Sequence, residues 1–411
     1  MKQNLRHFVC YLLIVPLFLA CNPRTSTKVF NPAQVNFQVE YSPILENCLY
    51  PSYILGLNHH NTLKEDINLF SLNVTAPRDN AVLRIVIDST LLNYTTIIQE
   101  VLPTRGERYT FHPSIKWKYD NLYATRKQGS VDFTFTCFIN DEEVDIRNLN
   151  LNYRSVNECL LSTRKNGRTY DFRWLFAGYV NEDHPYIPQI LSEILSQGTI
   201  KSFTGYQGNA QSVSNQVKAI WYYALNHGIS YSSISCTSNP APNTNVQHIR
   251  FFDEVYQNRQ ANCIDACVFF ASIMRKTGLK PIIFVEPCHA YLGYYTDKNR
   301  RNVALLETTV SSWINFPDIE RSLDPRTGMP SSSKMPALNK YLTPVQQEKF
   351  AKGELTFEDV KHLISDSLFY RATHYNDEDY RQNKPNFEDS TNIIYQQLII
   401  EDLRQLVQPI N

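Results

Sequence analysis

The hydrophobic pattern of this chain changes near residue 155, and that change limits the possible folds more than any other sequence feature. Before it, short runs of β-branched and aromatic residues alternate with polar ones and are separated by turn-forming residues such as Asn140-Asp141. A period of two with such interruptions predicts several short strands. The expected strands cover Ile67–Val74, Val82–Ile87, Val131–Ile139 and Val144–Tyr153. We therefore expect residues 35–155 to form a β-sandwich.

After residue 155 the apolar residues recur at helical spacing. Val213, Val217 and Ile220 share one helix face, and Gly228 follows where a helix commonly ends. Residues 229–234 are expected to be extended, and prolines among residues 240–243 predict a loop. A second helix with an apolar stripe is expected from Cys263 to Lys276.

Three strands should follow this second helix, over Leu279–Val285, Leu292–Tyr295 and Val303–Thr308. The chain is then expected to be rich in loops and to end in helices over residues 344–370 and 389–408. The expected fold class is therefore α+β. An N-terminal immunoglobulin-like β-sandwich precedes an α+β domain over residues 156–411, which carries a C-terminal helical extension.

The first residues predict a targeting segment. Lys2 and Arg6 precede the apolar run Phe8–Leu19, which is too short to span a membrane as a mature helix. The run ends in Phe18-Leu19-Ala20-Cys21, which resembles a bacterial lipobox. We expect residues 1–21 to be a lipoprotein signal peptide with lipidated Cys21, and residues 22–34 a tether. Several acyl chains would anchor the protein stably in the cell envelope, at the outer membrane or a periplasmic face. An ordinary secretory signal with an incidental cysteine is the alternative.

Charge and cysteine content narrow the function classes. The chain has 40 Lys and Arg against 40 Asp and Glu, so no basic excess indicates nucleic-acid binding. Of nine cysteines, Cys10 and Cys21 lie in the signal region, and the other seven are scattered without a CxxC pair. An odd number of thiols with no disulfide pattern favours an unpaired, reactive cysteine.

One set of residues in the second half carries the chemistry. Cys263 stands where a helix begins, and the free N–H groups and dipole of a helix start stabilise a thiolate. His289 follows a Pro287-Cys288 turn, where a neutral imidazole could accept the thiol proton. A hairpin would bring Glu307 beside His289, and a carboxylate there would orient the ring and stabilise its cation.

These residues and their neighbours resemble the transglutaminase-like superfamily, which has a papain-type α/β fold. The matching stretches are Asn262-Cys263-Ile264-Asp265, Phe270-Ala271-Ser272, Gly278-Leu279-Lys280-Pro281, His289-Ala290-Tyr291-Leu292-Gly293-Tyr294 and Leu306-Glu307-Thr308-Thr309. The resemblance implies a papain-type domain in which Cys263 is the nucleophile, His289 the base and Glu307 the orienting acid. Two positions depart from the family pattern: the acid is usually Asp, and Gly is expected where Cys288 stands.

The donor for an oxyanion is harder to assign from the sequence. Gln257 stands six residues before Cys263, a spacing similar to that of the papain-type glutamine. Arg259 is a second candidate, and the backbone N–H of Cys263 is a third. A surface position is the alternative for both side chains.

Simpler interpretations of the same residues remain open. Cys263 could be a buried small residue or half of a disulfide, His289 a structural histidine, and Glu307 an exposed carboxylate. Cys263, Cys267, Cys288 and His289 could bind zinc, although their spacing is unusual, so we expect no metal and no cofactor. Cys288 could also form a regulatory disulfide with Cys263 or Cys267, whereas Cys267 on its own favours core packing.

The function expected from these residues is that of a membrane-anchored thiol enzyme. Cys263 would form an acyl-enzyme with a peptide or protein amide. Hydrolysis is favoured over transfer to an amine, because water is abundant at a cell surface. The expected partners are a peptide or protein substrate and, through the lipid anchor, a membrane. The alternative is a catalytically inactive lipoprotein that binds a partner or has a structural role.

Overall fold

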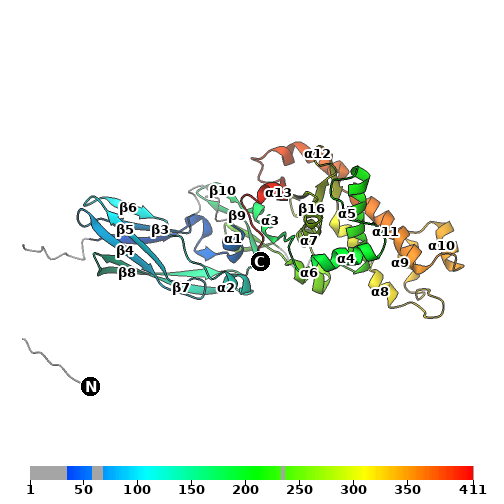
Figure 1. Ribbon diagram of the computed structural model, residues 1–411, viewed down its shortest axis with the longest axis horizontal. Coiled ribbons are helices and arrows are strands. Elements are labelled where there is room, and N and C mark those ends of the chain that lie inside the picture. The colour runs from blue at the N-terminus through cyan, green and yellow to red at the C-terminus, as the bar shows by residue number, and fades with distance from the viewer. Residues whose placement is uncertain (1–34, 58–67, 233–236, 411) are drawn as a thin grey trace, which may run out of the picture.

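The computed structural model describes residues 35–57, 68–232 and 237–410. The predicted signal peptide, lipidated Cys21 and the tether of residues 22–34 lie outside this part. Helices and strands are mixed, which confirms the α+β class. In the part that is described, no helix has both the length and the apolar character needed to cross a membrane. Figure 1 shows an elongated molecule, with the N-terminal strands at one end and most helices at the other.

Two sheets form the N-terminal end. Their strands are β1 Phe37–Tyr41, β2 Cys48–Leu49, β3 Phe70–Thr75, β4 Ala81–Ile87, β5 Thr96–Leu102, β6 Arg108–Phe111, β7 Gly129–Ile139 and β8 Glu142–Tyr153. One sheet has the order β2-β8-β7-β4-β5 and the other the order β1-β3-β6. The ring of Phe70 in β3 lies 5.1 Å from that of Phe133 and 5.5 Å from that of Phe135, both in β7, so the two sheets face each other. The four predicted strands are confirmed to within a few residues.

A second region, between the two ends, contains a sheet that the sequence pattern did not predict. Its strands are β9 Glu158–Lys165, β10 Arg168–Asp171, β12 Thr237–Ala241 and β13 Thr244–His248, in the order β10-β9-β13-β12. The loop expected at residues 240–243 is therefore wrong in part, because β12 includes Pro240. β12 is an edge strand with a register shift between Ser238 and Ala241, a place where a proline without an N–H is tolerated in a sheet.

The sheet beside the predicted site is antiparallel, with the order β17-β16-β15-β18. Its strands are β15 Pro281–Glu286, β16 His289–Tyr295, β17 Val303–Leu306 and β18 Gln396–Ile399. Helix α7 (Cys263–Lys276) packs against β15 and β16. Helix α12 (Asp377–Glu388) brings Phe387 onto the rings of Phe284 and Tyr291, which form a second apolar cluster. The predicted helix and the three strands after it are confirmed.

The C-terminal segment differs from the expectation. The predicted helix over 344–370 is present as α10 (Pro344–Ala351) and α11 (Phe357–His374), but the helix expected over 389–408 is wrong. Residues 396–399 form β18, which pairs with β15, and only α13 (Ile400–Leu403) is helical beyond it. An apolar run this short fits a strand or a helix equally well, and pairing with the edge of β15 selects the strand.

The remaining elements connect these sheets into one continuous apolar core. They are α1 Pro51–Gly56, α2 Tyr119–Ala124, α3 Phe176–Tyr179, α4 Ile187–Ser196, α5 Ala210–Asn226, β11 Ser230–Tyr231, α6 Phe252–Asn258, β14 Gln260–Ala261, α8 Phe316–Glu320, α9 Met335–Asn339 and 3-10 helices at Pro43–Leu45, Arg173–Leu175 and Thr308–Trp313. The C-terminal end returns to the middle of the molecule (Figure 1), where the N–H of Ile410 donates to the carbonyl of Gly178 at 2.7 Å.

Candidate active site

Cys263 is the first residue of α7, and its place is fixed by a buried polar cap. The side chain of Asn262 accepts the N–H of Asp265 at 2.9 Å, and the Asp265 carboxylate accepts the N–H of Asn262 at 2.9 Å. This reciprocal pair satisfies two backbone donors that a helix start leaves without partners. The carboxylate of the fully buried Asp265 also accepts the backbone N–H of Arg250 at 2.8 Å and its guanidinium at 2.6 Å. The thiol is therefore carried on a rigid helix start.

The hairpin β15–β16 positions the imidazole. Glu286 pairs with His289 across a two-residue turn made by Pro287 and Cys288. Cys288 has a φ of 63°, in the left-handed region that favours glycine, and a proline before such a residue is typical of a type II turn. This geometry gives a physical reason for expecting Gly at that position. It also leaves the Cys288 side chain exposed at the rim of the site.

The three predicted catalytic residues meet in the structure. Leu292 pairs with Leu306 in the β16–β17 ladder, which leaves His289 and Glu307 at the same end of the sheet, as predicted. His289 Nε2 lies 2.8 Å from Glu307 Oε2. An ionised carboxylate can only accept, so the ring nitrogen is the donor. Cys263 lines the same cleft as His289, and its side chain is near enough to raise the pKa of the imidazole.

The carboxylate of Glu307 is fully buried and accepts four hydrogen bonds. Its Oε1 accepts the N–H of Thr309 at 3.0 Å and the hydroxyl of Thr309 at 2.6 Å. Its Oε2 accepts His289 and the side-chain amide of Asn376, each at 2.8 Å. Four donors match the acceptor capacity of a carboxylate, so its orientation is determined despite the longer side chain of Glu compared with Asp.

The two partners stabilise each other's charged forms. Burial works against the cation of His289, but its hydrogen bonds to Cys263 and Glu307 and their charges outweigh burial and raise the pKa of the ring to about 10. Burial also opposes the anion of Glu307, yet the hydrogen bonds from His289, Thr309 and Asn376 hold its pKa below the ordinary value. The charged form of the ring is therefore favoured, and the buried carboxylate of Glu307 holds it in the wall of the cleft.

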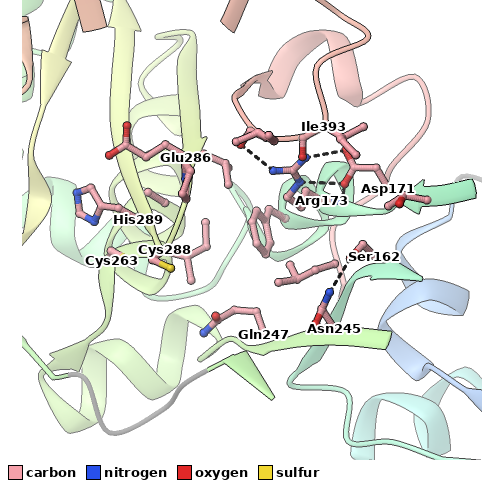
Figure 2. A pocket seen from close by; sticks show the side chains of 18 residues that line it. Ser162, Asp171, Arg173, Asn245, Gln247, Cys263, Glu286, Cys288, His289 and Ile393 are labelled. Atoms are coloured by element: carbon pink, nitrogen blue, oxygen red, sulfur yellow. Dashed lines mark hydrogen bonds and ion pairs between the residues drawn. The ribbon is translucent and has the colours of Figure 1, made fainter. Parts of the chain in front are cut away.

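A cleft of about 510 Å³ opens in front of the sulfur. Figure 2 shows Cys263, Cys288, His289 and Glu286 on one side of it, and Asp171, Arg173 and Ile393 on the other. Ser162, Asn245 and Gln247 of the sheet β10-β9-β13-β12 complete the lining. A cleft lined by apolar side chains and a few polar groups is the usual form of a ligand site.

One partly buried cation, Arg173, holds the far wall of this cleft. The guanidinium of Arg173 pairs with Asp171 at 2.9 Å and donates to the backbone carbonyls of Ile393 and Ile394. Because these partners occupy the guanidinium, the wall presents mainly the apolar side chains of the two isoleucines.

Glu286 is a second acid at the cleft. Burial and a hydrogen bond to the side chain of Asp379 in α12 raise its pKa to about 7, while the charge of His289 acts in the opposite direction. A carboxyl group near a second acidic side chain ionises less readily, because like charges repel each other. The cleft therefore carries a carboxyl group that titrates near neutral pH.

Two predicted oxyanion donors lie elsewhere. Gln257, in α6, donates its side-chain amide to the hydroxyl of Tyr186 at 3.2 Å and does not line the cleft. Arg259 ends α6 with a φ of 55° and also lies away from the cleft. Gln247 of β13 does line it, with its amide 2.9 Å from the carbonyl of His248. The N–H groups of the first turn of α7 are the donors closest in sequence to the sulfur.

The other cysteines do not join the site as disulfides. In the described part all six, including Cys263, Cys267 and Cys288, are free thiols. Cys267 is fully buried on α7, its sulfur 4.0 Å from the hydroxyl of Thr308, and burial raises its pKa well above the ordinary value. Across residues 35–57, 68–232 and 237–410 no three His, Cys, Asp or Glu side chains converge as metal ligands would.

Sequence reasoning missed several contributors. Asn376 and Arg250 belong to segments with no recognisable motif, and Asn376 is 69 residues from its partner Glu307. Thr309 is different, because it is two residues after Glu307, where a hydroxyl commonly bonds a nearby side chain. Asn262 and Asp265 belong to a stretch that resembles the family pattern, but nothing in the sequence indicated the arginine that pairs with Asp265.

Comparison with known proteins adds no independent assignment. No protein-family model matches the chain, and no curated protein matches it. The function therefore has to be argued from the site.

Proposed function

We propose that this chain is a transglutaminase-like thiol enzyme that acts on peptide or protein amides through an acyl-enzyme at Cys263. One observation supports this more than any other: the buried carboxylate of Glu307 holds the imidazole of His289 in the wall of the cleft that Cys263 also lines. Nucleophile, base and orienting acid in this order are the requirement for covalent catalysis by a thiol.

The reaction follows from the ionisation of these groups. The Cys263 thiolate attacks the amide carbonyl carbon, and first-turn N–H groups of α7 stabilise the negative oxygen that forms. The tetrahedral intermediate expels the amine, which takes a proton from the His289 cation, and a thioester remains on the sulfur. A water molecule then attacks the thioester while His289 accepts its proton. The acid is released, and the proton returns the pair to its starting state.

Glu307 supports both steps without changing its own proton. It accepts the Nε2 hydrogen of His289, which holds the ring with its other nitrogen toward the sulfur. Its carboxylate also stabilises the imidazolium that exists before the attack and again during hydrolysis. Transfer of the acyl group to an amine would use the same thioester, and we favour hydrolysis because water reaches an open cleft at a cell surface.

The rest of the chain has supporting roles in this proposal. The lipid on Cys21 would hold the protein in the cell envelope, and the N-terminal sheets, as an immunoglobulin-like sandwich, would set the distance between the site and the membrane. The apolar side chains of Ile393 and Ile394 line the wall opposite the sulfur and would contact the substrate.

Thiol reactivity tests the proposal without knowledge of the substrate. Cys263 should react with iodoacetamide near neutral pH much faster than Cys288, although Cys288 is the more exposed thiol. Cys263→Ala should remove the fast phase, whereas Cys288→Ala should leave it in place. Equal, slow reaction of both thiols would instead favour the inactive lipoprotein that binds a partner.

A further inference from the structure

Asn376 lies at the junction of α11 and α12, far in sequence from every other residue of the site. It is buried, with 7% of its surface exposed, and its side-chain amide reaches Oε2 of Glu307 at 2.8 Å. A carboxylate offers no hydrogen, so the amide must present its N–H₂ side to that oxygen. The C-terminal helical segment thus contacts the acid that orients His289.

The side chain of Asn376 makes this contact in place of its usual local one. Asn376 is the N-cap residue of α12, a position where asparagine normally accepts an N–H of the first helical turn. Here it makes no such bond, although the helix begins at the next residue. The side chain of Asn376 therefore bonds to Glu307 and does not cap the first turn of α12.

The backbone around Asn376 is held firmly enough to fix the direction of this amide. Its carbonyl accepts the N–H of Tyr380 at 2.8 Å, and Tyr380 packs its ring on Phe284 of β15. The preceding helix is tied to the same acid, because the N–H of Glu307 donates to the carbonyl of Ala372 at 2.8 Å. Both ends of this contact are therefore anchored in the sheet that carries His289.

We propose that Asn376 is a fourth functional residue of the site, a positioning residue that acts through Glu307. Both bonds from Thr309 go to Oε1 of Glu307, so without Asn376 the other oxygen would be held by His289 alone. Asn376 gives that oxygen a second donor and so fixes the position in which it meets His289. Because the amide is neutral, it adds no positive charge that would compete with the imidazolium for the carboxylate. This inference rests on the proposed function, since it assigns a role within the same site.

The role predicts a specific change in pH dependence. Removing a donor from the Glu307 carboxylate makes protonation of that carboxylate easier, so the imidazolium loses its partner at a higher pH. The acid limb of the Cys263 alkylation profile should then move to higher pH by roughly one unit, the size expected for one lost hydrogen bond to a charged group. Glu286, whose charge also acts on His289 and whose pKa is about 7, is present in every protein compared. A residue that only stabilised the fold would lower the melting temperature and leave the position of the limb unchanged.

The experiment compares Asn376→Ala and Asn376→Leu with Asn386→Ala. Leucine has the same number and branching of side-chain heavy atoms as asparagine, and α12 should still form because the Asn376 side chain contributes no cap. Asn386 is a matched control in the same helix, bonded only to Asn383 at 3.1 Å in the structure. Each folded protein is alkylated with iodoacetamide across a pH range, and the imidazole shifts of His289 are followed by ¹⁵N NMR over the same range.

We expect both Asn376 variants to move the acid limb and the acid-side inflection of the His289 shifts upward, and Asn386→Ala to move neither. The proposal is overturned if folded Asn376 variants keep the wild-type positions. Slow alkylation of wild-type Cys263 would instead defeat the proposed function. The NMR inflection then decides alone: a shift in the Asn376 variants supports the positioning role, and no shift rejects it.

Discussion

His289 Nε2 and Glu307 Oε2 lie 2.8 Å apart and are held there by a pair of antiparallel strands. The acid is fully buried and the ring is partly exposed, with 29% of its side-chain surface accessible. The contact therefore joins the interior of the protein to the wall of the cleft. An anion with no access to water is an efficient partner for a cation, because the solvent screens it weakly.

Replacing the acid by its amide tests this contact directly. Glu307→Gln keeps the size of the side chain but removes its charge, so the pKa of His289 should fall from about 10 toward the ordinary value. A ring whose folded-state pKa is raised contributes stability that is fully present below its unfolded pKa and is lost as pH rises through about 10. Chemical denaturation from neutral to alkaline pH should therefore show a decline in wild type that Glu307→Gln largely lacks. The exposed Glu143→Gln should behave like wild type, and an unchanged decline in Glu307→Gln would contradict the assignment.

The buried pair of Arg250 and Asp265 should matter for stability as well as for the site. Arg250→Ala leaves a fully buried carboxylate without its cation, a change that typically costs about 3–5 kcal/mol. Urea unfolding would measure the loss. Arg108→Ala provides the comparison, because its contact with Glu40 is exposed and at 3.9 Å is expected to contribute under about 1 kcal/mol. Similar losses in the two variants would show that the cap of α7 does not depend on Arg250.

Gly293 occupies a place in β16 where no side chain fits. A Cβ built there would lie 2.5 Å from Cε2 of Phe284, whose ring is stacked on Tyr291 and cannot move aside. Gly293→Ala should destabilise the protein by about 1–3 kcal/mol through overpacking. Phe284→Leu should relieve part of that cost, so the double variant would be more stable than the sum of the single effects predicts. Additive losses in thermal melts would refute the clash.

Glu286 should give the site a titration near neutral pH. Its pKa is raised to about 7, so its ionisation disfavours the folded state as pH rises from the unfolded value through about 7. Glu286→Gln should consequently be more stable than wild type at about pH 8, with the difference vanishing below the unfolded pKa of a carboxyl group near 4.3. Thermal melts at both pH values measure this. Glu348→Gln, at an exposed surface carboxylate, is the control, and a gain of equal size in that variant would argue against a raised pKa of Glu286.

The sequence was sufficient for the contacts that are local in the chain. Cys263, His289 and Glu307 lie within one helix and the hairpins that follow it, so their element types and order constrain how they meet. Gln257 shows the limit of spacing arguments. It is near Cys263 in sequence, but the left-handed turn at Arg259 redirects the chain, and its amide bonds to Tyr186 instead.

The missed parts depend on contacts between distant segments. β18 becomes a strand because β15 offers an open edge, and the polar residues of β9 and β13 become a cleft wall because their sheet lies opposite α7. The hydrophobic pattern of residues 389–408 gives no indication that the edge of β15 is available for pairing. Asn376 is hidden for the same reason, since an asparagine before a helix predicts a cap and gives no sign of a partner 69 residues away.

The pairing of β18 with β15 also sets an order of events during synthesis. A growing chain presents Cys263, His289 and Glu307 well before residues 376–399 exist, and until then the acid lacks one donor and the cleft lacks the wall carried by Ile393 and Ile394. The surroundings of Cys263 are therefore completed only after residues 376–399 have been made and have folded onto the earlier segments.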